Sequence, residues 1–256
     1  MTKDIQNHHD ERGSALVYIL IAIALLALLT VTFMSPSSQQ TQSQNAFKLV
    51  SELQSQADYI RTAVQECALT YPKGDANIPN ATSESDEGAH KRYPINPDSA
   101  YYSDATDIQE AGDRLVEHIR CPGQQDGPLQ KDHALIFGGN SGRFLSPPPP
   151  LFNKWQWYNG KDGVFFWISS EKTDAFIQTA LEKLDALYAD CEADIIQGGN
   201  DDLDQDGTVK CNAGSSTSTC FRVWIITDTQ NGTGAPEDGP ADPETSLYPD
   251  ETACNN

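Results

Sequence analysis

The sequence predicts an α+β fold: a long N-terminal helix, first transmembrane and then amphipathic, packed on a small disulfide-bonded domain with an antiparallel sheet. Three observations lead to this prediction. Residues 15–34 include no charged side chain. Apolar side chains then recur at helical spacing from Phe47 to Cys67, through Val50, Leu53, Ala57, Ile60 and Val64. Two aromatic segments, WQWYN and VFFWI, flank the turn GKDG and indicate a β-hairpin.

The uncharged segment is long enough to cross a membrane. A helix of 20 residues at ~1.5 Å per residue is about 30 Å long, which matches the hydrocarbon core of a bilayer. A cleaved secretory signal has a shorter apolar core, and the residues after 34 offer only a weak cleavage site. Lys3 and Arg12 precede the segment and the next basic residue is Lys48, so we expect a cytoplasmic N-terminus and a domain outside.

The residues around this segment resemble the N-terminus of type IV pilins and pseudopilins. A short polar leader ends in Arg12-Gly13, Ser14 opens the apolar run directly, and an amphipathic helix continues beyond Pro36, which must kink or break it. The opening RGSALV looks most like X-type minor pilins and K-type minor pseudopilins. The resemblance implies that a prepilin peptidase cuts between Gly13 and Ser14 and that the apolar helix is retained.

The resemblance also implies a location and partners. The apolar helix would hold the subunit in the bacterial inner membrane as a single pass and later bundle with helices of other pilin-like subunits. The C-terminal domain would lie in the periplasm or in a surface filament. Most major pilins have a glutamate at the fifth mature position, where this chain has Tyr18. Because that glutamate pairs with a neighbouring N-terminus, Tyr18 fits a minor or tip subunit better.

The chain divides into five predicted parts. They are a leader (1–13), a transmembrane helix (14–35), its amphipathic continuation (36–72), an extracytoplasmic α+β domain (73–229) and an acidic flexible tail (230–256). Within them we expect a hinge (37–45), a long loop (73–106), a short helix (108–119), a short strand (135–137), a polyproline II segment (146–152), a helix (173–193) and a central strand (220–227).

Six cysteines follow the apolar segment: Cys67, Cys121, Cys191, Cys211, Cys220 and Cys254. None forms a CxxC or CxxH pair, so zinc is not indicated. An even number beyond a membrane segment fits disulfides in an oxidising compartment. Six cysteines allow 15 pairings. Among them we favour Cys67 with Cys121 and Cys191 with Cys211.

The net charge of −20 argues against nucleic acid as a partner. The sharpest local motif is acidic: Asp202, Asp204, Asp206 and Gly207 match the D-x-D-x-D-G start of a calcium loop, and Asp201 adjoins it. An EF-hand needs glutamate at the twelfth position, where this chain has Ala213. Two interpretations stay open, a structural calcium ion and an unoccupied acidic turn. The resemblance adds weight to the first, because calcium-bound loops occur in pseudopilins.

The expected function is that of a structural subunit of a type IV pilus or type II secretion-like filament, without catalytic residues. The alternative is a calcium-dependent binding module for a sugar or surface polymer on a permanent signal-anchor. Such a module would use Trp155, Trp157 and Trp167 as an aromatic platform, although packing in the hairpin core is their expected role. A third hypothesis is a hydrolase using Ser141 or His133, although GGNSG is not a G-x-S-x-G motif.

Overall fold

The computed structural model describes residues 11–34, 38–78, 90–102, 114–126, 132–160, 163–189, 192–198, 201–203, 209–212 and 217–227. The chain has an α+β fold with antiparallel sheets and disulfides. It divides into two compact units, Met1–Asn45 and Ala46–Asn256.

The first unit contains helix α1 (Glu11–Met34) and the start of helix α2 (Ser38–Thr70). The described side chains of α1 run from Leu16 to Thr30 and all are exposed. Within the side chains that the structure describes, no helix has both the length and the apolarity needed to span a membrane. The predicted transmembrane helix therefore stays a prediction, and the predicted kink at Pro36 lies outside the described residues.

The predicted hinge over residues 37–45 is wrong from Ser38 onward, because that residue already begins α2. The segment is polar, but it contains neither glycine nor proline. Its four glutamines have a helix propensity close to that of leucine. Polarity alone therefore did not distinguish a hinge from an exposed stretch of helix.

The second unit is organised around α2 from Ala46 onward. One stripe of this helix is buried: Ala46, Leu49, Val50, Leu53, Ala57, Ile60, Ala63, Val64 and Cys67. The predicted helical spacing is confirmed, with one exception. Phe47 is 61% exposed, and the Lys183 ammonium lies 4.2 Å from its ring centroid. The helix ends at Thr70, just before Pro72 and Gly74, as predicted.

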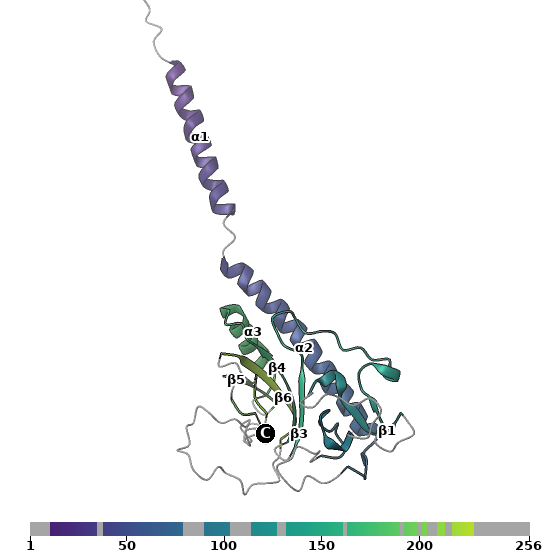
Figure 1. Ribbon diagram of the computed structural model, residues 1–256. Coiled ribbons are helices and arrows are strands. Elements are labelled where there is room, and N and C mark those ends of the chain that lie inside the picture. Colours follow the sequence, from purple (N-terminus) through teal and green to yellow (C-terminus); the bar gives the residue numbers. More distant parts are fainter. Residues whose placement is uncertain are drawn as a thin grey trace, which may run out of the picture. The chain divides into compact units, whose positions relative to one another are not determined.

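Four antiparallel strands form the main sheet in the order β3-β4-β6-β5 (Figure 1). They are β3 (Gln156–Gly160), β4 (Gly163–Ser170), β5 (Ala193–Gln197) and β6 (Thr219–Thr227). The predicted hairpin is confirmed, since Trp157 pairs with Phe166 and Gly160 with Gly163. The prediction of a central strand is also confirmed, because β6 lies between β4 and β5.

Side chains of this sheet alternate between two cores. The helix-facing core joins the stripe of α2 and helix α3 (Ala175–Asp185) to Trp157, Val164, Phe166, Ile168, Ala193, Phe221 and Val223. The opposite core contains Tyr158, Phe165, Trp167, Ile196, Leu203, Val209, Cys211, Cys220 and Trp224. Because both faces are covered, β4 is buried at every position and its sequence shows no polar alternation.

Helix α3 is shorter than the predicted span of residues 173–193. It ends at Asp185, and Ala193 begins β5, a strand that we did not predict. The turn after the helix is closed by hydrogen bonds from the Leu187 and Tyr188 amides to the carbonyls of Leu184 and Asp185. Leu187 and Tyr188 continue the helical spacing of apolar residues although they lie beyond the helix. A prediction from this spacing alone therefore put the C-terminal end of the helix too far along the chain.

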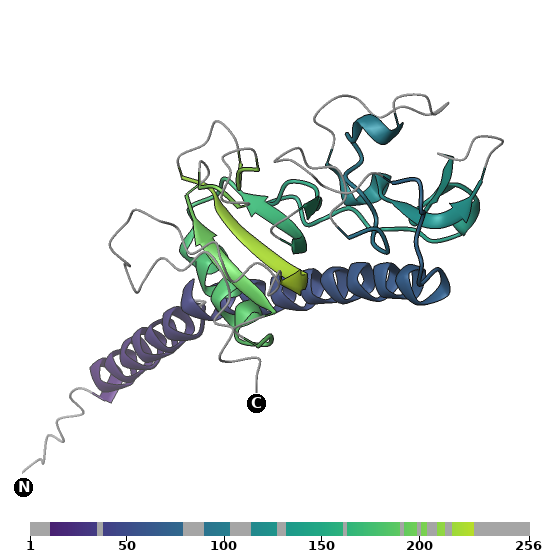
Figure 2. The same ribbon diagram turned by 90° about the horizontal axis from the view of Figure 1, so that it is seen from below.

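A second sheet pairs β1 (Arg120–Gln125) with β2 (His133–Leu135). Figure 2 shows both sheets on the same side of α2, with the small sheet near its C-terminal end. We did not predict β1, because Pro122-Gly123 is a turn signal. Of the predicted short strand over residues 135–137, only Leu135 belongs to a strand, as the last residue of β2. Of the predicted helix over residues 108–119, the described part contains the 3-10 helix η2 (Val116–His118).

Two disulfides lie within the described residues. Cys67–Cys121 is confirmed, with a Cα–Cα distance of 5.8 Å. The pairing of Cys191 with Cys211 is wrong, because Cys211 pairs with Cys220 across 5.7 Å. The reason is topological: Cys220 in β6 faces the core that Cys211 also enters. Cys191 and Cys254 lie outside the described residues.

The predicted long loop has a small core of its own in its described parts, residues 73–78 and 90–102. This satellite core consists of Ile78, Ile95, Tyr101 and Tyr102, the last two in the 3-10 helix η1 (Ala100–Tyr102). The two parts approach each other closely at Gly74, whose φ is +56°. A Cβ at this position would lie 1.8 Å from the Lys91 carbonyl oxygen. Only glycine fits this approach.

Candidate functional site

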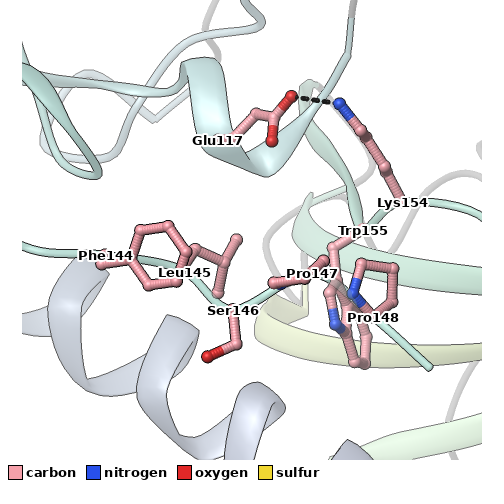
Figure 3. A pocket seen from close by; sticks show the side chains of 8 residues that line it. All are labelled: Glu117, Phe144, Leu145, Ser146, Pro147, Pro148, Lys154 and Trp155. Atoms are coloured by element: carbon pink, nitrogen blue, oxygen red, sulfur yellow. Dashed lines mark hydrogen bonds and ion pairs between the residues drawn. The ribbon is translucent and has the colours of Figure 1, made fainter.

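A pocket of about 310 Å³ opens beside η2 and the proline-rich segment (Figure 3). Its lining is mostly apolar with one ion pair: Glu117, Phe144, Leu145, Ser146, Pro147, Pro148, Lys154 and Trp155. In Figure 3, Phe144 and Leu145 face Pro147, Pro148 and Trp155 across the opening. The Lys154 Nζ donates to Glu117 Oε1 at 2.6 Å on the rim. Such a pocket suits an apolar side chain or ring of a ligand.

A buried glutamine of α2 positions one wall of this pocket. Gln56, 6% exposed, accepts a hydrogen bond from Trp155 Nε1 at 2.8 Å. Its amide nitrogen donates to the Pro147 carbonyl at 3.0 Å. The helix thus holds the proline-rich segment and the tryptophan together through one side chain, although Pro147 and Trp155 lie 91 and 99 residues further along the chain.

The predicted aromatic platform is wrong as an exposed surface. Trp155, Trp157 and Trp167 are 2%, 0% and 1% exposed. Trp157 Nε1 donates to the Pro94 carbonyl, and Trp167 Nε1 donates to the Cys211 carbonyl. The expected alternative, packing in the core, is confirmed for all three, and Trp155 alone also lines the pocket.

Ser141 and His133, the residues named in the hydrolase hypothesis, have different hydrogen-bond partners. The Ser141 hydroxyl, in the 3-10 helix η3 (Gly139–Ser141), donates to the Gly138 carbonyl at 2.6 Å. His133 is 2% exposed, and its ring nitrogens lie 2.8 Å from Asp75 Oδ2 and 3.4 Å from the Tyr102 hydroxyl. Ser141 and His133 therefore serve different networks.

The acidic motif is only partly described. Asp204, Asp206 and Gly207 lie outside the described residues, as does Ala213. The ends of the motif are tied together, because the Leu203 amide donates to the Val209 carbonyl at 2.7 Å and Asp202 forms a β-bridge with Lys210. Among the residues that the structure describes, no three or more His, Cys, Asp or Glu side chains converge as metal ligands. Calcium stays a prediction.

Two other carboxylates, Asp194 and Glu192, are paired with arginines. Asp194 accepts from Arg222 Nε at 2.9 Å and from Arg222 Nη2 at 2.5 Å. Arg222 is 0% exposed, and its Nη1 donates to the Leu203 carbonyl at 2.8 Å. Glu192 accepts from Arg61 at 3.2 Å. The pair Arg222–Asp194 thus fastens the acidic segment to the sheet.

A buried polar cluster connects the predicted loop to β2, and the sequence analysis did not find it. Asp75 Oδ2 accepts from the Tyr101 hydroxyl at 2.5 Å and from His133 Nε2 at 2.8 Å. Asp75 Oδ1 accepts from the Asn77 amide at 2.8 Å and from its side chain at 2.7 Å. The Arg120 guanidinium donates to the His133 carbonyl at 3.1 Å and lies over the Tyr102 ring.

Burial and hydrogen bonding set the charges in this cluster. Burial raises the pKa of the Asp75 carboxyl, but hydrogen bonds from Tyr101, Asn77 and His133 outweigh it and lower that pKa to about 2. Burial lowers the pKa of His133 below its ordinary value, and the opposing effect of Asp75 is smaller. At neutral pH the cluster therefore contains an ionised Asp75 and a neutral His133.

Gly13 and Ser14, the residues of the predicted processing site, lie in the first turn of α1, and processing stays a prediction. Comparisons with protein-family models, with curated protein sequences and with solved structures found no match to this chain.

Proposed function

We propose that the chain is a minor pilin-like or pseudopilin-like structural subunit of a type IV pilus or type II secretion-like filament. One observation carries the proposal: an exposed apolar helix, with Arg12-Gly13-Ser14 in its first turn, precedes a second helix packed on an antiparallel sheet. The sequence motif supplies the processing site, and the packed stripe of α2 matches the expected amphipathic half of such a subunit.

The exposed apolar surface of α1 supports placement in a membrane before assembly. Its large apolar side chains from Leu16 to Leu29 are between 50% and 70% exposed. Burial of apolar area is favourable by about 25 cal/mol per Å², so this surface is costly in water. A bilayer or a bundle of neighbouring subunit helices would cover it. Ala15, Ala22, Ala24 and Ala27 leave room for such helices to approach closely.

The proposed work of the subunit is assembly and contact with other proteins. The peptidase would free the amino group of Ser14, and the domain, outside the inner membrane, would be presented at the filament. Tyr18 at the fifth mature position fits a minor subunit. The disulfide Cys67–Cys121 suits an oxidising compartment such as the periplasm.

The N-terminus of the native chain tests this proposal. We expect the protein isolated from its own cells to begin at Ser14, with a methylated amino group, when it is examined by intact mass and terminal sequencing. Gly13→Leu should leave the leader attached, because the expected peptidase cuts after glycine. Ser14→Ala keeps a small residue after the cut and serves as the matched control. A native chain that begins at Met1 or Thr2 overturns the proposal.

A structural calcium ion at Asp201, Asp202, Asp204 and Asp206 is part of the proposed subunit. Calcium that binds only the folded chain at 100 times its dissociation constant should add about 2.7 kcal/mol to the free energy of unfolding. Thermal unfolding in millimolar calcium and in chelator measures this shift, which Asp204→Asn with Asp206→Asn should abolish. Magnesium is the control cation, because it demands a tighter octahedral site. Equal melting temperatures with calcium and with chelator would remove the ion from the proposal.

A further inference from the structure

The buried polar cluster lies at the satellite core and apart from the main hydrophobic cores. Tyr101 and Tyr102 belong both to the satellite core and to the cluster, whereas the helix-facing and opposite cores contain neither. All 4 tryptophans of the chain belong to those two larger cores. A change confined to the satellite core can therefore be told from unfolding of the sheet.

The hydrogen-bond partners of His133 specify one neutral tautomer. The Asp75 carboxylate can only accept, so His133 Nε2 must carry the hydrogen of their 2.8 Å contact. The other ring nitrogen, Nδ1, then accepts from the Tyr102 hydroxyl at 3.4 Å. A second proton would occupy Nδ1, and the buried Tyr102 hydroxyl would then have to turn its hydrogen away and lose Nδ1 as its acceptor.

The surroundings of the ring oppose the added charge. His133 is 2% exposed, and the groups that face it are Asp75, Tyr101, Tyr102, Arg120 and Asp132. Asp75 and Asp132 favour the protonated ring, but Arg120 and burial disfavour it, and burial is the largest effect. The net result is a pKa below the ordinary value.

We propose that His133 is a proton-operated latch, which holds residues 75–78 and 99–102 against β2 when neutral and releases them on proton uptake. The released segments are those that contact the ring through Asp75, Tyr101 and Tyr102. The sheet and its two cores stay folded, because their packing does not include these side chains.

A second set of contacts explains why the release is local. Residues 90–96 are held on β3 by Asn159, which is 0% exposed. Its side-chain amide donates to the carbonyls of His90 and Pro94, and its backbone exchanges hydrogen bonds with the Asn96 side chain. Amide groups do not titrate, so this attachment persists when the pH falls.

The sign of the pH dependence follows from linkage. The closed state has residues 75–78 and 99–102 held against β2, and the open state has them released. Because the pKa of His133 is lower in the closed state, the open state binds more protons. Closure is fully stable above the ordinary histidine pKa of about 6.5 and weakens as the pH falls below it, by up to about tenfold in the opening equilibrium per pH unit. Asp75, with its pKa near 2, weakens closure only at lower pH, between about 4 and 2.

Hydrogen–deuterium exchange of the full chain at pH 7, 6 and 5, corrected for intrinsic rates, tests the latch. Opening of residues 75–78 and 99–102 should rise up to about tenfold per pH unit, while β3, β4 and tryptophan emission stay unchanged. His133→Gln keeps an amide donor toward Asp75 but cannot titrate, so its exchange should be flat between pH 7 and 5. His118→Gln, at a half-exposed histidine of η2, is the matched control and should behave as the wild type.

A wild-type chain without this rise, or a His133→Gln variant that retains it, overturns the latch. If tryptophan emission shows that His133→Gln is misfolded, Tyr102→Phe replaces it. Without the Tyr102 hydroxyl, proton uptake costs no hydrogen bond, so the segments should be more open at pH 7 and respond less steeply to acid. An unchanged slope in this variant likewise overturns the proposal.

Discussion

Replacing Cys67 and Cys121 with alanine is expected to lower the free energy of unfolding of the second unit by about 4 kcal/mol. The disulfide closes a loop with a sequence separation of 54, and cross-linking a longer loop removes more entropy from the unfolded chain. It also joins the C-terminal end of α2 to β1, so the small sheet loses its covalent attachment to the helix.

Chemical unfolding followed by tryptophan emission measures this change. The matched control is the pair Cys211→Ala and Cys220→Ala, whose disulfide has a sequence separation of only 9. The same entropy estimate gives about 3 kcal/mol for that loop, so the first variant should be the less stable of the two. The reverse order would show that strain or residual structure, and not loop length, determines what each disulfide contributes.

Replacing Asp194 with alanine is expected to cost about 3 kcal/mol, because it leaves the buried guanidinium of Arg222 without its carboxylate. Arg222 is the buried partner at 1% side-chain exposure, against 21% for Asp194. The loss should therefore come mainly from leaving this buried charge without a counterion, because the rings of Trp224 and Phe165 that it faces offer only weak cation–π attraction. The exposed side of Asp194 keeps the cost at the lower end of the range for buried pairs.

Glu192→Ala is the matched control, since it removes a neighbouring carboxylate paired with Arg61 at the surface. Exposed pairs contribute about 0–1 kcal/mol, so this variant should unfold almost as the wild type does. Asp194→Leu combined with Arg222→Met should recover most of the stability lost in Asp194→Ala. Equal costs for Asp194→Ala and Glu192→Ala in urea unfolding would contradict the assigned role of the buried arginine.

The elements predicted correctly are those whose signal is local in sequence. The buried stripe of α2 repeats every three or four residues, and the hairpin has aromatic strands on both sides of a glycine turn. β6 is apolar almost throughout, as a strand covered on both faces must be. In contrast, β5 has only five residues and directly follows a turn that still shows helical spacing.

The candidate site depends on contacts that no local pattern encodes. Asp75 and His133 are 58 residues apart in the sequence, and no sequence motif includes both of them. The pocket combines η2, the proline-rich segment and the start of the hairpin, of which sequence analysis selected Trp155 alone, for a different role. The Cys211–Cys220 pairing was missed for a related reason, because the spacing of cysteines does not reveal which face of a sheet they share.

The position of β6 between β4 and β5 has a consequence for biosynthesis. The ribosome completes β4 and β5 first, yet these strands do not pair with each other. Translation adds roughly 60 residues between the end of β4 and the end of β6, which takes several seconds at about 5–20 residues per second. Until β6 is made, β4 has one open strand edge, and β5 adds a second once it is complete, so the nascent domain must be shielded from wrong strand pairing until its last strand takes the central place.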